Sequence, residues 1–265
     1  MIDRRAAFHA LHRAGRPLLL PNAWDHASAA ALAARGHQAI GTTSLGVAAT
    51  AGLPDGAAAT ATETLALARR LARLPVLLSV DVEAGFSDDP VEVAEYVAEL
   101  AGLGVVGINL EDGRADGTLA DTEVAAAKVA AVKVAVPDLF VNARTDTWWL
   151  GVDDPLPQTL ARARAYLVAG ADGIFVPGTV DLATLRALTE GIDAPVNALY
   201  QPGGPGLVEL SAAGVARVST GSLLFRAALG AALAAADAVA HGGSGTPAGL
   251  PSYAEVQALV PADGD

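Results

Sequence analysis

Short apolar segments alternate with helical patterns along almost the whole chain, and this alternation restricts the fold more than any other feature. Several of these segments are continuous apolar runs, as expected for parallel strands covered on both faces. The helical patterns between them supply the crossover connections that parallel strands need. Eight strands in this order predict an α/β protein with a (β/α)8 TIM-type barrel. The predicted strands are Leu18–Asn22, Gln38–Thr43, Val76–Val82, Val105–Glu111, Leu139–Arg144, Gly173–Pro177, Pro195–Leu199 and Ala216–Ser219.

Glycines at the predicted helix-to-strand joints and capping residues at helix starts support the same reading. A doubly wound open sheet is the alternative, but the chain lacks an early Gly-x-Gly-x-x-Gly fingerprint, so the barrel is favoured. The predicted helices are Ala27–Arg35, Thr62–Leu74, Pro90–Leu103, Thr122–Val136, Pro157–Ala169, Asp181–Thr189 and Pro205–Ala213.

The length of 265 residues fits one barrel domain of about 250 residues. A Gly- and Pro-containing stretch begins near His241, so we expect one barrel domain over residues 1–242 and a tail over residues 243–265. The tail carries one weak helical pattern, Tyr253–Leu259, and we expect it to pack on a neighbouring subunit.

Charge and composition exclude several classes of function. The formal net charge is −12 and Lys and Arg form no cluster, which argues against nucleic acid or an anionic membrane as a partner. Cysteine is absent, which rules out disulfides and thiol catalysis. The first residues lead into an amphipathic stretch and not into a signal-peptide core, so we expect a cytoplasmic protein.

Carboxylates follow two neighbouring predicted strands at once. Asp81 and Glu83 come at the end of the third strand, and Glu111 ends the fourth. Side chains alternate along a strand, so Asp81 and Glu83 should share a face. Three acids at the carboxyl ends of barrel strands would repel one another unless a cation lay between them. An oxygen-rich site of this kind suits Mg²⁺, with Mn²⁺ as an alternative; the competing interpretation is separate helix caps or solvated loop acids.

Arg144 ends the fifth predicted strand, where a cation in an apolar run needs a partner. It either pairs with one of the acids above or binds a substrate anion. The Thr43-Ser44-Leu45 segment follows the second strand and could cradle a carboxylate or phosphate, although an ordinary polar turn has the same composition. Gly203, Gly204 and Gly221 could hold a phosphate at a helix N-terminus.

Five segments at or after the predicted strand ends form a recognisable set: Asn22-Ala23-Trp24-Asp25, Thr43-Ser44-Leu45, Asp81-Val82-Glu83-Ala84-Gly85-Phe86, Asn109-Leu110-Glu111-Asp112 and Asn142-Ala143-Arg144-Thr145-Asp146. Together they resemble the isocitrate lyase/phosphoenolpyruvate mutase superfamily, and the resemblance runs over nearly the whole chain. The Asp-x-Glu-x-Gly-Phe run followed by Leu-Glu-Asp is the most specific part of it.

This resemblance implies an α/β barrel whose last helix is swapped between subunits of a homodimer or homotetramer, Mg²⁺, and a small α-oxo- or α-hydroxycarboxylate ligand. By position, Asp81 resembles the direct metal ligand, while Asp55, Glu83 and Glu111 resemble its water-mediated partners. Arg144, Asp55 and Glu111 form the implied catalytic set. The implied substrate-binding set is Trp24, Asp25, Thr43, Ser44, Leu45, Arg144 and Asn197.

The loop after Glu111 differs from the corresponding loop in two subgroups of this superfamily, the lyases and the phosphonate-forming enzymes. Lyase members carry a catalytic cysteine in a Lys-Lys-Cys-Gly-type run there, and phosphonate-forming members carry a Lys and an Asn. Residues 113–119 of this chain contain no Cys, Lys or His. The general acid is therefore open among Asp116, Tyr200 and a water in the Arg114 loop.

Four functions remain. The first is a Mg²⁺-dependent lyase that breaks a C–C bond of a small oxo or hydroxy acid through an enolate, pyruvate-like species, since metal sites stabilise developing oxyanion charge. The second keeps the site but performs P–C chemistry of the phosphoenolpyruvate mutase type, or hydrolysis of oxaloacetate. The third is a metabolite-binding barrel without turnover. The fourth is a phosphate-binding biosynthetic barrel.

Overall fold

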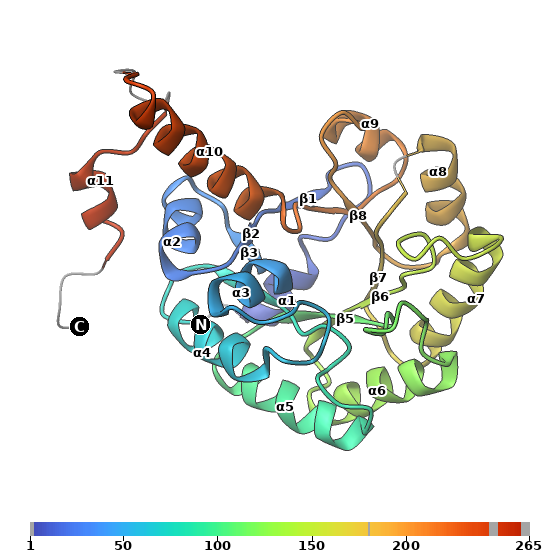
Figure 1. Ribbon diagram of the computed structural model, residues 1–265. Coiled ribbons are helices and arrows are strands. Elements are labelled where there is room, and N and C mark those ends of the chain that lie inside the picture. Colours follow the sequence, from blue (N-terminus) through green and yellow to red (C-terminus); the bar gives the residue numbers. More distant parts are fainter. Residues whose placement is uncertain (1–2, 180, 244–248, 261–265) are drawn as a thin grey trace.

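The strands form one parallel sheet that curls into a barrel with helices outside it, in a computed structural model that describes residues 3–179, 181–243 and 249–260 (Figure 1). The strand order is β1-β9-β8-β7-β6-β5-β4-β3-β2, so the first and last parts of the chain meet where the barrel closes. The strands are β1 (Leu18–Leu20), β2 (Asn22–Ala23), β3 (Ala39–Thr42), β4 (Leu77–Asp81), β5 (Gly107–Glu111), β6 (Phe140–Arg144), β7 (Gly173–Val176), β8 (Val196–Leu199) and β9 (Arg217–Ser219).

β1 and β2 together make the first stave of the barrel, broken at Pro21. Proline has no N–H to donate to a ladder, so a strand is interrupted where it stands. Before the break, β1 pairs with β9, and after it β2 pairs with β3. The side chain of Asn22 closes the gap, because its Oδ1 accepts from the backbone N–H groups of Thr220 at 2.9 Å and Gly221 at 3.0 Å.

Most helices cover the outer face of the barrel and bury Val, Leu, Ile and Ala side chains against the strands. Asp at the N-cap starts α2, α5 and α8 by accepting from a backbone N–H of the first turn. The helices are α1 (Arg4–His9), α2 (His26–Ala34), α3 (Ser44–Ala51), α4 (Ala61–Leu71), α5 (Pro90–Gly102), α6 (Thr122–Ala135), α7 (Pro155–Val168), α8 (Leu182–Gly191), α9 (Leu207–Ala212), α10 (Leu223–Ala240) and α11 (Tyr253–Gln257).

The predicted (β/α)8 barrel is confirmed, and each predicted strand and helix has a counterpart within a few residues of its predicted ends. Three of the described helices are absent from the predicted set: α1, α3 and α10. α3 begins at Ser44, inside the segment predicted as a polar loop after the second strand. The weak pattern Tyr253–Leu259 corresponds to the short α11.

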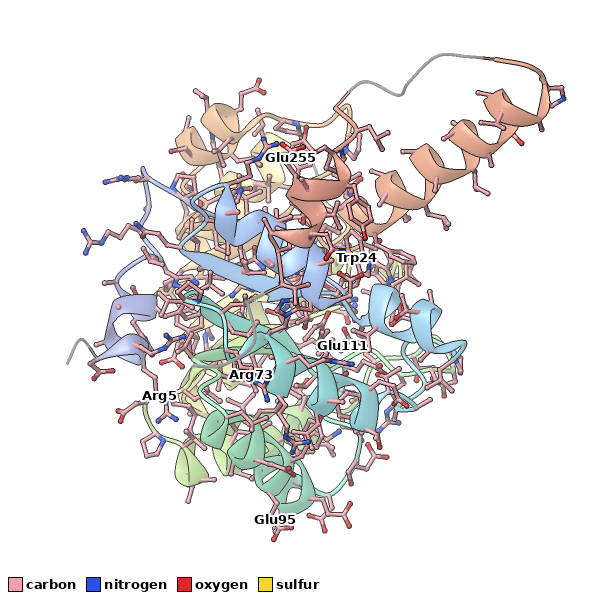
Figure 2. All side chains as sticks on the ribbon, turned by 90° about the vertical axis from the view of Figure 1, so that its left-hand side faces the viewer. Arg5, Trp24, Arg73, Glu95, Glu111 and Glu255 are labelled. Carbon is pink, nitrogen blue, oxygen red and sulfur yellow. The ribbon has the colours of Figure 1, made fainter. Side chains whose placement is uncertain are left out.

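α10 leaves the barrel and extends away from it, as Figures 1 and 2 show from two sides. None of its residues is buried, and Leu229 and Leu233 are 51% and 59% exposed. Among the described helices it alone is long and apolar enough to span a bilayer by length and composition, although it contains Arg226 and Asp237. α11 lies beside α2 of the same chain, with His26 Nε2 at 3.3 Å from the Leu259 carbonyl oxygen. The division at residues 242 and 243 stays a prediction, since residues 244–248 and 261–265 lie outside the described ranges.

Candidate active site

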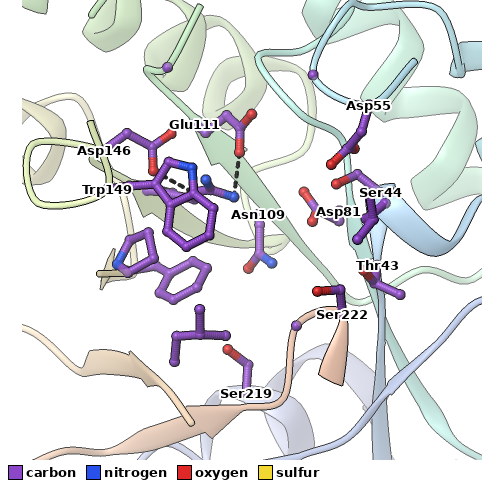
Figure 3. A pocket seen from close by; sticks show the side chains of 18 of the residues that line it. Thr43, Ser44, Asp55, Asp81, Asn109, Glu111, Asp146, Trp149, Ser219 and Ser222 are labelled. Atoms are coloured by element: carbon purple, nitrogen blue, oxygen red, sulfur yellow. Dashed lines mark hydrogen bonds and ion pairs between the residues drawn. The ribbon is translucent and has the colours of Figure 1, made fainter. Parts of the chain in front are cut away.

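A cavity of about 750 Å³ opens at the carboxyl end of the barrel strands (Figure 3). This is the end where parallel α/β barrels carry their chemistry, because the loops that follow the strands meet there. Seven of the predicted site residues line the cavity: Thr43, Ser44, Leu45, Asp55, Asp81, Glu111 and Arg144.

Asp81 is the last residue of β4 and pairs in register with Asn109 of β5. Its backbone N–H donates to Thr42 Oγ1 at 2.9 Å, which fixes the end of the strand. Burial raises the pKa of Asp81 to about 6, against the opposing charge of Arg144, and the nearby carboxylates of Asp55 and Glu83 raise it further. A carboxylate with a raised pKa at this position is one that a cation would stabilise.

Arg144 ends β6 and lies between two carboxylates. Its Nη1 is 2.6 Å from Glu111 Oε2, and its Nε donates to Asp146 Oδ1 at 2.7 Å. Burial raises the pKa of Glu111 well above its ordinary value, and Asp146 and Asp81 raise it further, while Arg144 lowers it. Burial lowers the pKa of Arg144, but its carboxylate neighbours outweigh burial, so the net shift is upward and the guanidinium stays charged. The predicted pairing of Arg144 with acids is present, and Arg144 also lines the cavity, so its binding of a substrate anion stays a prediction.

Asp112 supports this cluster from behind the cavity. Its Oδ1 accepts from the Asp146 backbone N–H at 2.8 Å. Its Oδ2 accepts from Tyr166 at 2.6 Å and from Arg162 Nη1 at 3.0 Å. Each carboxylate oxygen is thus used, as a buried charge requires. Asp112 therefore fixes the backbone that carries Asp146, and through Asp146 it fixes Arg144.

The Thr43-Ser44-Leu45 segment passes from β3 into α3 at the rim of the cavity. Thr43 is the N-cap of α3. The first N–H groups of a helix have no partner within the helix, and the N-terminus favours negative charge. The segment thus offers Thr and Ser hydroxyls together with backbone donors, which suits the carboxylate that was predicted to bind there.

Glu83 lies beyond the end of β4, in a left-handed conformation with φ of 48°. Its carboxylate accepts from Thr60 Oγ1 at 2.6 Å and from the Ala58 N–H at 3.0 Å. The argument that strand alternation places Glu83 beside Asp81 is wrong, because the strand has already ended. Glu83 lines a second cavity next to the first, and as a metal residue it stays a prediction.

Three residues predicted to bind substrate do not line the main cavity. Asp25 caps α2 in a capping box with Ser28, and Trp24 packs edge-on against Phe225. Asn197 is buried inside the barrel and donates to Ser219 Oγ at 3.3 Å, so only its partner reaches the cavity. As substrate-binding residues these three stay predictions, and a motif places a residue in the chain without deciding which way its side chain points.

The carboxylates fit a cation that is held directly by one of them. Within the described ranges, no three His, Cys, Asp or Glu side chains come close enough to bind one ion together. In the same ranges, the Asp81 carboxylate accepts one hydrogen bond, from the Glu83 N–H at 3.4 Å. Its oxygens are therefore available, and Mg²⁺ commonly keeps several waters that reach other carboxylates.

The sequence interpretation missed further residues of the cavity. The amide of Asn109 lies near its centre between Trp149 and Asp81 (Figure 3). Asp146 completes the Arg144 cluster, and its place two residues after an arginine that needs a partner could have indicated it. Further polar side chains of the lining are Asn22, Gln201, Ser219, Thr220, Ser222 and Arg226.

The loop after β5 is a tight hairpin in which Gly113 pairs with Leu119. Asp116 lies outside the main cavity, and hydrogen bonds from Thr118 lower its pKa. A lowered pKa makes a carboxyl group a poor proton donor near neutral pH. Tyr200, the other predicted donor, lines the cavity.

Comparison with known proteins identifies the family. A family model described as Phosphoenolpyruvate phosphomutase matches residues 8–240. The chain belongs to the phosphoenolpyruvate phosphomutase family. An uncharacterised protein of Mycobacterium tuberculosis strain H37Rv is 49% identical over 254 residues, which cover 96% of each chain. The 2-methylisocitrate lyase of Salmonella typhimurium is 32% identical over 203 residues, which cover 72% of this chain and 68% of that protein.

Among solved structures, phosphonopyruvate hydrolase in complex with oxalate and Mg²⁺ has the same fold, with a TM-score of 0.84. The match covers 97% of this chain and 95% of that one at 24% identity, so it shows the fold alone. The resemblance predicted from the sequence is confirmed, because the matched family model describes a mutase and a 2-methylisocitrate lyase is among the relatives of this chain.

Proposed function

We propose that this protein is a Mg²⁺-dependent carbon–carbon lyase that acts on a small α-oxo or α-hydroxy carboxylic acid through an enolate, pyruvate-like intermediate. One observation carries the proposal: a single cavity holds available carboxylates, Asp55 and Asp81, together with the charged guanidinium of Arg144. Acidic oxygens suit a divalent cation, and the arginine suits the oxygens of an anionic ligand. The family includes C–C lyases, which supports the same reaction class.

Asp81 would hold the cation directly, and Asp55, Glu83 and Glu111 would hold it through water. Mn²⁺ would be accepted at the same oxygen ligands. Bound there, the cation supplies positive charge that stabilises an enolate oxygen as the bond to the neighbouring carbon breaks.

The remaining groups act on the organic ligand. Thr43, Ser44 and Leu45 offer hydroxyl and backbone donors to its carboxylate. Arg144 keeps Nη2 outside its two ion pairs, and this nitrogen can donate to the oxygen that gains charge. Of the two side chains predicted to supply a proton, Tyr200 is favoured, because it lines the cavity and Asp116 does not.

Two other functions keep this site and change the outcome. Phosphonate or oxaloacetate chemistry would use the same cation and arginine on a different bond. A protein that only binds a metabolite would keep the ligand site without turnover. The hairpin of residues 113–119, which lacks Cys, Lys and His, is the observation that favours the metabolite-binding function.

The test is a turnover screen with purified protein and Mg²⁺. The panel contains 2-methylisocitrate and other 2-hydroxy acids, oxaloacetate and phosphonopyruvate. The product followed is an oxo acid for the hydroxy acids, oxalate for the hydrolysis of oxaloacetate, and phosphate for phosphonopyruvate. We expect C–C cleavage of a hydroxy acid, lost with a chelator and restored by Mg²⁺. Release of phosphate from phosphonopyruvate alone would support P–C chemistry instead. Binding of oxalate without any turnover would support the metabolite-binding function.

A matched pair of variants tests the site itself. Asp81→Asn should abolish turnover, since it removes the direct ligand for the cation. Asp193→Asn makes the same change at an exposed position outside the cavity and should leave turnover unchanged. Equal effects of the two changes would contradict the assignment of Asp81.

We further propose that α10 packs against a second copy of the chain in a homodimer or homotetramer, as the predicted helix swap requires. Exposed leucines on a helix that leaves its own barrel suit an apolar partner surface. Ser222 and Arg226, at the start of this helix, line the cavity, so its position matters for the site. A cytoplasmic location is part of the same proposal.

A further inference from the structure

Arg217 is a charged side chain in the interior of the barrel. It lies on β9, is 1% exposed, and is the largest fully buried side chain of the described structure. Within the described ranges, its Nε and Nη1 have no hydrogen-bond partner. Burial lowers its pKa to about 9, and the charge of Asp81 opposes this shift. Such a residue is costly to bury, so the one hydrogen-bonded contact that its side chain makes among the described residues calls for an explanation.

That contact is with Asn109. Arg217 Nη2 donates to Asn109 Oδ1 at 3.0 Å, and Asn142 Nδ2 donates to the same oxygen at 2.9 Å. A guanidinium has donors only, so the atom of Asn109 that faces it must be the amide oxygen. The orientation of the Asn109 amide therefore follows from chemistry, with Nδ2 on the side away from Arg217.

The free side of this amide faces the cavity. Asn109 is in register with Asp81 on one neighbouring strand and with Asn142 on the other, so its side chain points into the barrel. It lines the cavity and lies near its centre, between Asp81 and Trp149 (Figure 3). Acids of the same cavity, among them Asp81 and Glu111, can only accept when they are ionised. An NH₂ group beside them is a donor suited to an anionic ligand.

We propose that Asn109 binds a carboxylate or enolate oxygen of the ligand through Nδ2, and that Arg217 positions this amide from below. The inference rests on the proposed function, since it assigns a further binding residue to the same site. A donor that is already oriented needs no reorganisation when the oxygen gains charge, which is the condition for strong stabilisation. Arg217 does not touch the ligand, and its role is exerted through Asn109.

The first test is Asn109→Asp, measured by calorimetric binding of oxalate to the Mg²⁺-loaded protein. Aspartate has the same shape and keeps an acceptor for Arg217 and Asn142, so the fold should survive. It replaces the NH₂ donor with an oxygen that repels an anion. We expect oxalate affinity to fall by at least about 10-fold, with the thermal midpoint and the Mg²⁺ affinity in the absence of oxalate not reduced.

The second test separates positioning from a structural role. Arg217→Met removes the donor below Asn109, whereas Arg217→Lys keeps a charge that can donate to the same oxygen. We expect the Met variant to weaken oxalate binding about 3- to 10-fold and the Lys variant to recover part of that loss. Equal oxalate affinities in both variants and the wild type would overturn the role of Arg217.

The outcomes for the two proposals differ. A wild-type protein that binds no oxalate with Mg²⁺ overturns the proposed function and the inference with it. A wild-type protein that binds oxalate while Asn109→Asp binds it equally well overturns the inference alone. Loss of Mg²⁺ binding together with oxalate binding in Asn109→Asp also overturns it, because the effect would then arise from the metal.

Discussion

Glu111 and Arg144 occupy paired positions on adjacent strands, and their side chains form an ion pair of 2.6 Å at the floor of the cavity. Register partners on parallel strands point to the same face of the sheet, so the pairing of β5 with β6 is enough to bring them together. Asp146 completes the cluster from the residue two positions further on. The arginine that faces the ligand is thus held by the strand register itself.

Removing the charge of Arg144 should destabilise the protein as well as weaken ligand binding. Arg144→Met leaves the buried carboxylates of Glu111 and Asp146 without their partner, and breaking a buried pair costs about 3–5 kcal/mol. Urea denaturation near neutral pH measures this loss. Because the raised pKa of Glu111 would rise further, the loss should shrink at acid pH, where the carboxylates are protonated.

Arg144→Lys is the matched control, since it keeps the charge but not the planar fork that serves both acids. We expect it to retain more stability than Arg144→Met while its oxalate affinity still falls, by about 10-fold or more. Wild-type affinity in the lysine variant would show that the geometry of the arginine does not matter.

Asp81 should make the metal-free protein less stable as pH rises. Its pKa in the folded protein is about 6, above its ordinary value of 3.8, so the folded state binds this proton more tightly than the unfolded state. The stabilising contribution is complete below the ordinary value and is lost as pH rises through 6. Without metal, Asp81→Asn should therefore be more stable than the wild type near pH 7.5, by on the order of 1 kcal/mol, with a smaller difference near pH 4.5.

Mg²⁺ should reverse this order of stability, so that the wild type becomes more stable than Asp81→Asn. It binds the ionised carboxylate, so its affinity for the wild type should increase between about pH 5 and pH 7 and should be weak for Asp81→Asn throughout. Thermal denaturation with and without Mg²⁺, at about pH 5 and about pH 7, measures this change in affinity as a shift of the midpoint. An unchanged wild-type midpoint on adding Mg²⁺ would contradict the metal assignment.

Asp112 should be a stability residue and not a ligand residue. Tyr166→Phe removes one of its hydrogen bonds and should cost about 1–3 kcal/mol, because Arg162 and the Asp146 N–H remain. Asp112→Ala leaves Arg162 and Tyr166 without their shared acceptor and should cost more. Denaturation midpoints measure both, and a turnover defect in Tyr166→Phe without any loss of stability would be the contrary result.

The exposed leucines of α10 give a test of assembly. Leu229→Asp combined with Leu233→Asp should convert the oligomer to a monomer, as measured by light scattering after gel filtration. Neither side chain is buried in its own chain, so the secondary structure of the barrel should be retained. A wild-type protein that is already monomeric would contradict the proposed assembly.

The barrel could be predicted from the sequence because each buried strand is a short apolar run that ends in a turn signal. α3 could not, because Gly46 and the hydroxyls around it are typical of a loop. In the structure, this glycine lets the helix pack closely on Trp24 and Thr43. The closeness of Gly46 to Trp24 is a tertiary contact, which a local sequence pattern does not reveal.

The candidate site likewise contains residues whose position could be predicted from the sequence and residues whose position could not. Asp81, Glu111 and Arg144 lie at strand ends, where position along the strand decides where a side chain points. Glu83 lies two residues beyond the end of β4, and the direction of its side chain depends on a backbone conformation that the sequence did not indicate. Arg217 could have been found by the argument used for Arg144, since it too is an arginine within an apolar strand.

The break at Pro21 has a consequence for how the barrel opens. Between the first and last staves, part of the backbone ladder is replaced by the side chain of Asn22, which holds Thr220 and Gly221. Backbone amides beside this break should therefore exchange their hydrogens faster than amides of the strands opposite, where the ladder is continuous. Asn22 also lines the cavity, so a ligand bound there would slow the exchange of the amides beside the break.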